Sequence, residues 1–161
     1  MQVGAIGRVY SFEPLPRNLT YLRRHLDLND IKNCEVVDAA VAASDGLAHF
    51  DSSRPAAMGR LSKSGNIEVK MVSIDFLVAS GRILPPDVMK IDVEGAEFAV
   101  LQGSASTINE HPPIIFLATH GPHAHHDCLH FLRNCNYNLE SLTNESLDLT
   151  EELLAYPEKR R

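Results

Sequence analysis

The apolar positions of the chain recur with two different periods, one typical of strands and the other of helices. Residues 8–12 form a short segment rich in β-forming side chains that stops before Pro14. Leucines then recur at helical spacing over residues 16–28, and Pro16 suits the first turn of that helix because it lacks an N–H. Residues 34–43 form a compact apolar run that predicts a strand buried on both faces.

The central part of the chain predicts short strands on either side of a loop. A strand is expected at residues 47–50, after a Ser-Asp-Gly turn, and an edge strand is expected at residues 67–72, where polar and apolar residues alternate. Residues 51–66 between them are rich in Ser, Gly, Arg and Pro and are interpreted as a loop. A short helix should follow, capped at its start by Ser73 or Asp75.

The second half of the chain repeats this order of strands and helices. Strands are predicted at residues 87–92, 114–118 and 137–139, helices at residues 94–102 and 104–110, and a His-rich loop and helix after the second of these strands. Alternation of nearly continuous apolar strands with helices is typical of an α/β fold whose parallel sheet carries helices on both faces. In such folds the ligand binds beyond the carboxyl ends of the strands, so the polar residues there are the candidates for function.

Length, charge and cysteine content narrow the class of protein. The 161 residues fit one domain, and the net charge of −6 argues against general binding to nucleic acid, whose phosphates an acidic protein repels. No apolar run approaches the roughly 20 residues of a membrane-spanning helix, and the N-terminus lacks a signal-peptide pattern. The three cysteines, an odd number, match no disulfide framework. These features predict a cytoplasmic protein that binds neither nucleic acid nor a membrane.

Two acidic residues follow the first apolar segments of the chain. Glu13 comes directly after the first predicted strand, where a carboxylate can accept hydrogen bonds from both hydroxyl groups of a ribose. Asp38 follows Val37 and can accept from the exocyclic amine of a purine, while Ala39 leaves room for the ring. The alternative interpretations are a surface glutamate at a turn and a buried stretch of small residues, and these positions alone do not decide between them.

Three carboxylates and one amine gather at the end of the strand at residues 87–92. Alternation places Lys90 and Asp92 on the same face of that strand, and Glu94 and Glu97 follow at once. Like charges so close resist ionising together, so we expect displaced pKa values or a nearby cation. The alternative is that Glu94 and Glu97 complement the positive N-terminal end of the next helix.

Histidines are concentrated after the last buried strand. His120 stands at the strand end and suits a general base because its ordinary pKa lies near neutrality, although a lone histidine can equally be structural. His126 and His130 are four residues apart and should share a helix face, which suits two ligands of a zinc or nickel ion. Because no ordered metal-binding spacing such as His-Glu-x-x-His occurs, we assign no metal site, and a His-cluster metal-binding protein remains an alternative function.

Three segments of the chain, in a fixed order, carry a family likeness. They are VYSFEPLPRN at residues 9–18, AVAASDG at residues 40–46, and MKIDVEGAE at residues 89–97 with VLQG at residues 100–103. This ordered set resembles the FkbM-type methyltransferase family over residues 8–121. The resemblance implies a Rossmann-like class I methyltransferase sheet with helices on both faces, and it implies S-adenosyl-L-methionine bound across the carboxyl ends of the strands.

The resemblance also implies roles for individual residues. The cofactor would be bound by Glu13 at the ribose, by Asp38 and Ala39 near the adenine, by Asp92 at the reaction end, and by Pro14 and Asn18 of the first segment. The catalytic candidates are Asp92, His120 and Lys90, with His120 or Asp92 as the proton acceptor. The implied reaction is O-methylation of a hydroxyl group on a small-molecule, sugar, lipid or polyketide acceptor.

The chain departs from the family pattern at its start. Family members usually have an earlier strand with an Asp-x-Gly-x-x-x-Gly-like loop and a helix, whereas seven residues precede Arg8 here. We therefore expect a single, N-terminally incomplete methyltransferase domain over residues 1–161, with a gap or a new pairing between the strands that contain Phe12 and Ile91. An exposed sheet edge would favour a homo-oligomer. A catalytically inactive remnant that serves as an interaction module is the alternative function.

Overall fold

The computed structural model describes residues 3–4, 6–50 and 67–158. The chain divides into two compact units: unit 1 comprises Met1–Val41 and Asp45–Val72, and unit 2 comprises Ala42–Ser44 and Ser73–Arg161. The prediction of one domain over residues 1–161 stays a prediction. The predicted loop at residues 51–66 lies outside the described residues.

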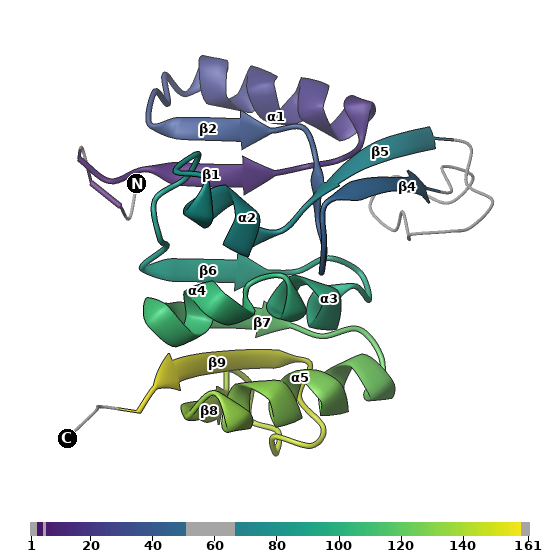
Figure 1. The fold of residues 1–161 in the computed structure, drawn as a ribbon, viewed down its shortest axis with the longest axis vertical. Helices are drawn as coiled ribbons and strands as arrows, with labels where there is room; N and C mark the ends of the chain where they lie inside the picture. Colours follow the sequence, from purple (N-terminus) through teal and green to yellow (C-terminus); the bar gives the residue numbers. More distant parts are fainter. Residues whose placement is uncertain (1–2, 5, 51–66, 159–161) are drawn as a thin grey trace. The chain divides into compact units, whose positions relative to one another are not determined.

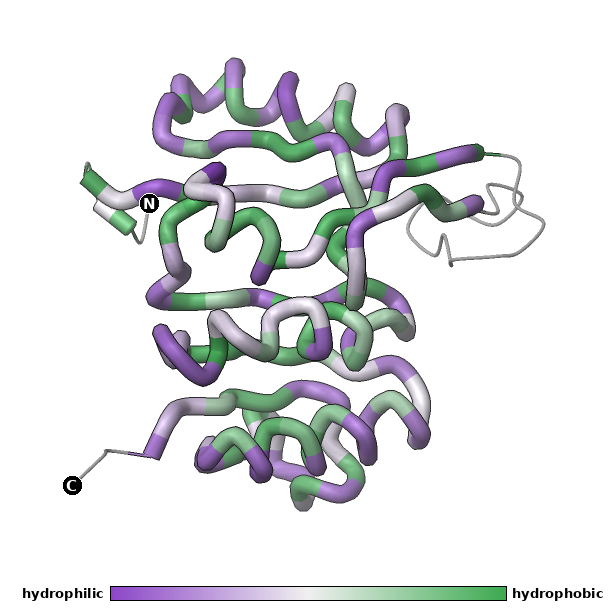
Figure 2. The backbone as a smooth tube through the Cα atoms, viewed as in Figure 1, coloured by the Kyte–Doolittle hydropathy of each residue, from purple (hydrophilic) through white to green (hydrophobic). Residues whose placement is uncertain are grey.

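Unit 1 begins with two parallel strands joined by a helix. Strand β1 (Val9–Phe12) pairs with β2 (Cys34–Val37), and α1 (Pro16–Leu28) runs between them in the chain (Figure 1). Helix α1 alternates between hydrophobic and hydrophilic positions (Figure 2) and buries Leu19. The predicted strand, the proline-started helix and the parallel arrangement are confirmed here, because a parallel pair requires such a crossover.

The apolar run at residues 34–43 is two strands rather than the single predicted strand. The backbone N–H of Ala39 donates to the carbonyl of Val37 at 2.9 Å, so the chain turns at the exposed Asp38. Beyond the turn, β3 (Ala40–Val41) belongs to a different sheet. Apolar composition alone could not reveal this break, since apolar residues lie on both sides of Asp38.

The second sheet of unit 1 has the order β3-β5-β4. Strand β5 (Ile67–Val72) is parallel to β3 and antiparallel to β4 (Gly46–Phe50). It is therefore the central strand, and the prediction of an edge strand is wrong. Its alternation of exposed and buried residues is confirmed, and Val69 packs in a small core with Leu15 and Ala40. A central strand can still alternate when one face of its sheet meets solvent.

Unit 2 is built on a four-stranded mixed sheet with the order β6-β7-β9-β8. Strands β6 (Val88–Ile91) and β7 (Ile114–Ala118) are parallel, as predicted, while β8 (Tyr137–Ser141) and β9 (Glu152–Pro157) add antiparallel pairs. The core side chains of one sheet face are almost fully buried, and they are Ile91, Ile115, Leu117, Leu153 and Ala155. Side chains of the opposite face are more exposed, with Val88 at 55% and Phe116 at 40%.

Four helices complete unit 2. They are α2 (Ile74–Ala79), α3 (Glu97–Gln102), α4 (Ala105–Glu110) and α5 (Pro122–Asn134). Of the two predicted caps, Ser73 caps α2, because its Oγ accepts from the backbone N–H of Phe76 at 3.3 Å. Asp75 instead accepts from the backbone N–H groups of Ser106 and Thr107, at 2.9 and 2.8 Å, and so caps α4.

The α/β class is confirmed, but the strands of the described residues form three separate sheets. Strand β1 lies in the sheet of β2 and strand β6 in the sheet of β7, and the expected gap or new pairing between the strands of Phe12 and Ile91 stays a prediction. None of the helices in the described part of the chain is long and apolar enough to span a membrane.

Candidate active site at the ends of β6 and β7

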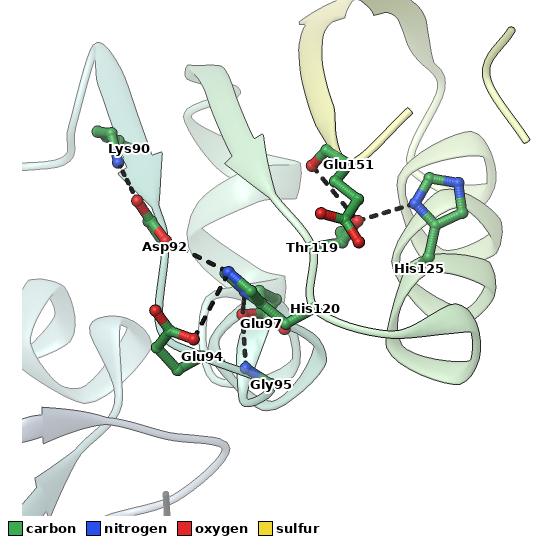
Figure 3. Close-up of polar contacts among 9 residues, drawn as sticks. All are labelled: Lys90, Asp92, Glu94, Gly95, Glu97, Thr119, His120, His125 and Glu151. Atoms are coloured by element: carbon green, nitrogen blue, oxygen red, sulfur yellow. Dashed lines mark hydrogen bonds and ion pairs between the residues drawn. The ribbon is translucent and has the colours of Figure 1, made fainter. Parts of the chain in front are cut away.

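Two neighbouring parallel strands bring the acidic segment and His120 to one edge of the sheet of unit 2. Ile91 pairs with Leu117 in the parallel register of β6 and β7, so the chain leaves both strands at the same edge. Asp92 follows β6 directly, and His120 follows β7 after Thr119. Figure 3 shows the side chains of Asp92 and His120 turned toward one another.

The chain turns sharply between β6 and α3. Glu94 has a φ of 55° and Gly95 a φ of 101°, and this left-handed backbone is uncommon for a residue other than glycine. As a result α3 begins at Glu97, three residues later than the predicted helix at residues 94–102. The backbone N–H of Gly95 donates to Oε1 of Glu97 at 2.8 Å, which stabilises the turn.

Glu97 is a fully buried carboxylate, with 0% of its surface exposed. Its Oε1 atom lies 2.8 Å from Nδ1 of His120 (Figure 3), while its Oε2 atom has no hydrogen-bond partner within the described parts of the chain. Burying a charge without a partner is costly, so the imidazole of His120 is the group that compensates Glu97. The sequence placed Glu97 in the acidic cluster at this strand end but not among the catalytic or cofactor-binding candidates.

The other ring nitrogen of His120 faces two more carboxylates. Its Nε2 atom lies 3.9 Å from Oδ1 of Asp92 and 3.7 Å from Oε2 of Glu94, which is too long for direct hydrogen bonds. Partial burial by itself would lower the pKa of His120, but the hydrogen bond to Glu97 and the charges of Glu94, Glu97 and Asp92 outweigh it and raise the pKa above its ordinary value of 6.5. His120 is therefore suited to take up a proton near neutral pH.

Lys90 and Asp92 share one face of the strand, as alternation predicted. The Nζ atom of Lys90 lies 2.7 Å from Oδ2 of Asp92. The side chains are 69% and 43% exposed, so this ion pair contributes little to stability. Because Oδ2 contacts Lys90, the Oδ1 atom of Asp92 is the oxygen that faces His120.

One group of described residues has the geometry to hold a metal ion. Asp92, Glu94 and His120 each offer a ligand atom, and these three atoms lie within 4.8 Å of one another. Carboxylate oxygens with one imidazole nitrogen suit divalent cations such as Mn²⁺ or Zn²⁺. Lys90 already places a positive charge beside Asp92, however, and a protonated His120 would supply a second.

The remaining histidines do not form such a group. His126 and His130 lie on one face of α5, as predicted, with their rings stacked at a centroid distance of 6.4 Å, but no third ligand residue joins them among the residues that the structure describes. His125 is structural: its Nε2 atom must donate to the carbonyl of Leu147 at 2.8 Å, so its Nδ1 atom accepts from the hydroxyl of Thr119 at 2.9 Å. The structure gives the alternative of a His-cluster metal-binding protein no support.

The predicted cofactor residues of unit 1 gather at the carboxyl ends of β1 and β2. Phe12 pairs with Val37, so Glu13 and Asp38 leave the strand pair at one edge, with Pro14, Asn18 and the buried Ala39 beside them in the chain. Oε1 of Glu13 accepts from the backbone N–H of Leu15 at 2.8 Å. Asp38 forms an exposed ion pair with Arg23 of α1. Nothing in the sequence linked Arg23 to the carboxyl ends of β1 and β2.

Comparisons with known proteins agree on one family. The family model described as the methyltransferase FkbM domain matches residues 1–139. The hexuronic acid methyltransferase AglP of Haloferax volcanii is 33% identical over 104 residues, which are 63% of this chain and 43% of that protein. The crystal structure of the methyltransferase FkbM from Methylobacillus flagellatus KT superposes with a TM-score of 0.67 at 20% identity, over 92% of this chain and 36% of that one. The chain thus spans less than half the length of either protein, and the structural likeness confirms the predicted fold.

Proposed function

Since the chain belongs to the FkbM methyltransferase domain family, we propose that it catalyses methyl transfer from S-adenosyl-L-methionine to a hydroxyl group of a sugar-type acceptor. The similarity to a hexuronic acid methyltransferase is what favours a sugar acid over a polyketide or lipid as acceptor. S-adenosyl-L-methionine supplies a methyl group bound to a positively charged sulfur, which an acceptor oxygen can attack in line. The protein then has two tasks, which are to position the reactants and to remove the hydroxyl proton.

The observation that carries this proposal is the orientation of His120. Because a carboxylate can only accept, the 2.8 Å contact with Glu97 places the hydrogen of the neutral ring on Nδ1. The lone pair is then on Nε2, which faces Asp92 and Glu94 at the strand end. Of the two proton acceptors that the sequence left open, the proposal assigns this step to His120, with Asp92 orienting the acceptor hydroxyl through Oδ1.

The residues at the carboxyl ends of β1 and β2 fit the cofactor chemically. Glu13 is half-buried and spends one acceptor site on Leu15, which leaves further lone pairs for the two ribose hydroxyls. Asp38 and Ala39 are proposed near the adenine, with Pro14 and Asn18 completing the segment. In unit 2 the carboxylates of Asp92 and Glu94 suit the positive charge of the methyl donor, and Lys90 holds Asp92 in place.

Calorimetric titration with S-adenosyl-L-methionine tests whether the cofactor residues are correctly assigned. The 161-residue chain should bind the cofactor, and Glu13→Ala should weaken binding by about tenfold or more, in line with loss of hydrogen bonds to a charged acceptor. Glu35→Ala is the matched control, because Glu35 is exposed on the neighbouring strand β2. Equal affinities for the two variants would remove Glu13 from the site. Absence of binding by the folded chain would contradict cofactor binding by these residues alone.

The predictions about the acceptor, the oligomeric state and the location of this chain stay as they were predicted from the sequence. A small-molecule acceptor is part of the proposal above. Assembly into a homo-oligomer through a sheet edge stays a prediction, as does a cytoplasmic location.

A further inference from the structure

We propose that Glu97 is a positioning residue, which fixes the orientation and the tautomer of His120 so that the lone pair of Nε2 faces Asp92 and Glu94. The consequence for catalysis, that this lone pair removes the proton of the acceptor hydroxyl, rests on the proposed function. The effect of Glu97 on the orientation and tautomer of His120 does not rest on the proposed function, because it follows from the contacts within unit 2.

Glu97 is held in place by its surroundings. Its carboxylate cannot move freely, because the side chain is fully buried at the start of α3 and Oε1 also accepts from the backbone N–H of Gly95 at 2.8 Å. Helix α3 is in turn packed on α5, where the rings of Phe98 and Phe131 meet edge to face at 6.3 Å. A hydrogen-bond acceptor held this firmly can orient a half-exposed ring that would otherwise sample several rotamers.

The hydrogen bond between His120 and Glu97 has a defined direction. Oε1 of Glu97 has no hydrogen to give when ionised, so Nδ1 of His120 is the donor across the 2.8 Å contact. Neutral imidazole carries a single N–H, and the bond therefore selects the Nδ1–H tautomer. Without Glu97, no other contact of Nδ1 among the described residues would favour this tautomer over the other.

Glu97 differs from the other two carboxylates that face His120 in distance and in burial. Asp92 and Glu94 lie 3.9 and 3.7 Å from Nε2, and their side chains are 43% and 36% exposed, so water screens them. Glu97 lies 2.8 Å from Nδ1 and is 0% exposed. Its short hydrogen bond makes Glu97 the largest of the three influences that raise the pKa of His120, and the charge of Glu94 comes next.

Among the described residues, the remaining titratable neighbours add no further negative charge at His120. On α5, burial raises the pKa of the Cys128 thiol to about 12, and the charges of Glu97 and Asp127 add to this effect, so the thiol stays neutral. Lys90 on β6 contacts Asp92. Within the described part of the chain, Oε2 of Glu97 has no hydrogen-bond partner, so the hydrogen bonds of the carboxylate there all run through Oε1, to Gly95 and His120.

Two substitutions separate the charge of Glu97 from its hydrogen bond. Glu97→Gln keeps an Oε1 atom that can accept from Gly95 and His120 but removes the charge. Glu97→Met fills a similar volume and removes both. Glu94→Gln is the matched control, since it removes a carboxylate that faces the same ring from 3.7 Å without a hydrogen bond to it.

The deciding measurement is the imidazole nitrogen spectrum of His120 by NMR as a function of pH, with the signals identified by their loss in His120→Gln. The wild-type chain should show the Nδ1–H tautomer and a titration midpoint above that of an ordinary histidine. Glu97→Gln should keep the tautomer and lower the midpoint, while Glu97→Met should lose the tautomer preference as well. Glu94→Gln should lower the midpoint but keep the tautomer, because it leaves the hydrogen bond to Nδ1 intact.

Two results would overturn the proposal: an Nε2–H tautomer in the wild-type chain, or a His120 spectrum that Glu97→Met leaves unchanged. Activity adds a second readout, in which Glu97→Met should lower kcat by about 10²–10⁴-fold, the usual range for a lost general base, with the KM for the methyl donor changed less than about twofold. In Glu97→Gln the rise of kcat/KM with pH should move to lower pH. Lack of methyl transfer together with the expected spectra would contradict the proposed function and not the role of Glu97.

Discussion

Oε1 of Glu97 lies 2.8 Å from Nδ1 of His120, and this contact joins residues that are 23 positions apart in the chain. It links the acidic turn after β6 to the end of β7, so that the two strand ends form one site. The bond explains how a half-exposed histidine can have a fixed orientation and a raised pKa, despite the opposing effect of its partial burial. It also explains why a carboxylate is tolerated at a position with 0% exposure.

The first prediction concerns pH and stability. Because the pKa of His120 is raised in the folded chain, its protonated form contributes stability that is fully present below the ordinary value of 6.5 and is lost as pH rises through the folded pKa. The wild-type chain should therefore exceed His120→Gln in free energy of unfolding by about 1–2 kcal/mol at pH 5.5, and the difference should shrink toward pH 9. Urea unfolding of both proteins across this range measures it. A difference that grows with pH would show that the sign is wrong.

The second prediction concerns the cap of α4. Asp75→Ala removes the acceptors of the backbone N–H groups of Ser106 and Thr107, and should lower the free energy of unfolding by about 1–2 kcal/mol. Asp87→Ala, at an exposed position before β6, is the control and should change it by less than about 0.5 kcal/mol. Equal effects of the two substitutions in urea unfolding would mean that the cap does not stabilise α4.

The third prediction concerns the cysteines, which are all free. Burial raises the pKa of Cys128 to about 12, so about one thiol in ten thousand is ionised at pH 8. Cys34 and Cys135 are half-buried, and burial raises their pKa values less. Iodoacetamide should modify these two before Cys128 in the folded chain, as peptide mass spectrometry would show. Modification of Cys128 first would mean that α5 opens readily.

Much of this fold could be predicted from the sequence where the signal is local. Proline at the start of α1, the apolar run of β7 and the alternation that places Lys90 beside Asp92 all act over a few residues, and the structure confirms each of them. The resemblance to the family indicated which segments of the chain contain the candidate site residues. The position of Asp92 and His120 at one sheet edge followed from the rule for parallel strands, and β6 and β7 obey it.

What the sequence did not reveal depends on pairing between distant segments. The turn at Asp38 and the central position of β5 follow from which strands pair, and that is decided by long-range contacts. The sequence likewise predicted no strand at Glu152–Pro157, although β9 lies between β7 and β8 in the sheet. The burial of Glu97 went unrecognised because an acidic residue in a first helical turn is explained equally well by the helix dipole.

The central claim is methyl transfer at the site of His120, and a transfer assay with labelled S-adenosyl-L-methionine and a hexuronic acid glycoside tests it most directly. Wild-type chain and His120→Gln are compared, with cofactor affinity measured for both. The account predicts transfer by the wild-type chain and a rate about 10²–10⁴-fold lower for His120→Gln at similar cofactor affinity. Equal rates for the two proteins, or no transfer to any sugar hydroxyl by a folded chain that binds the cofactor, would contradict it.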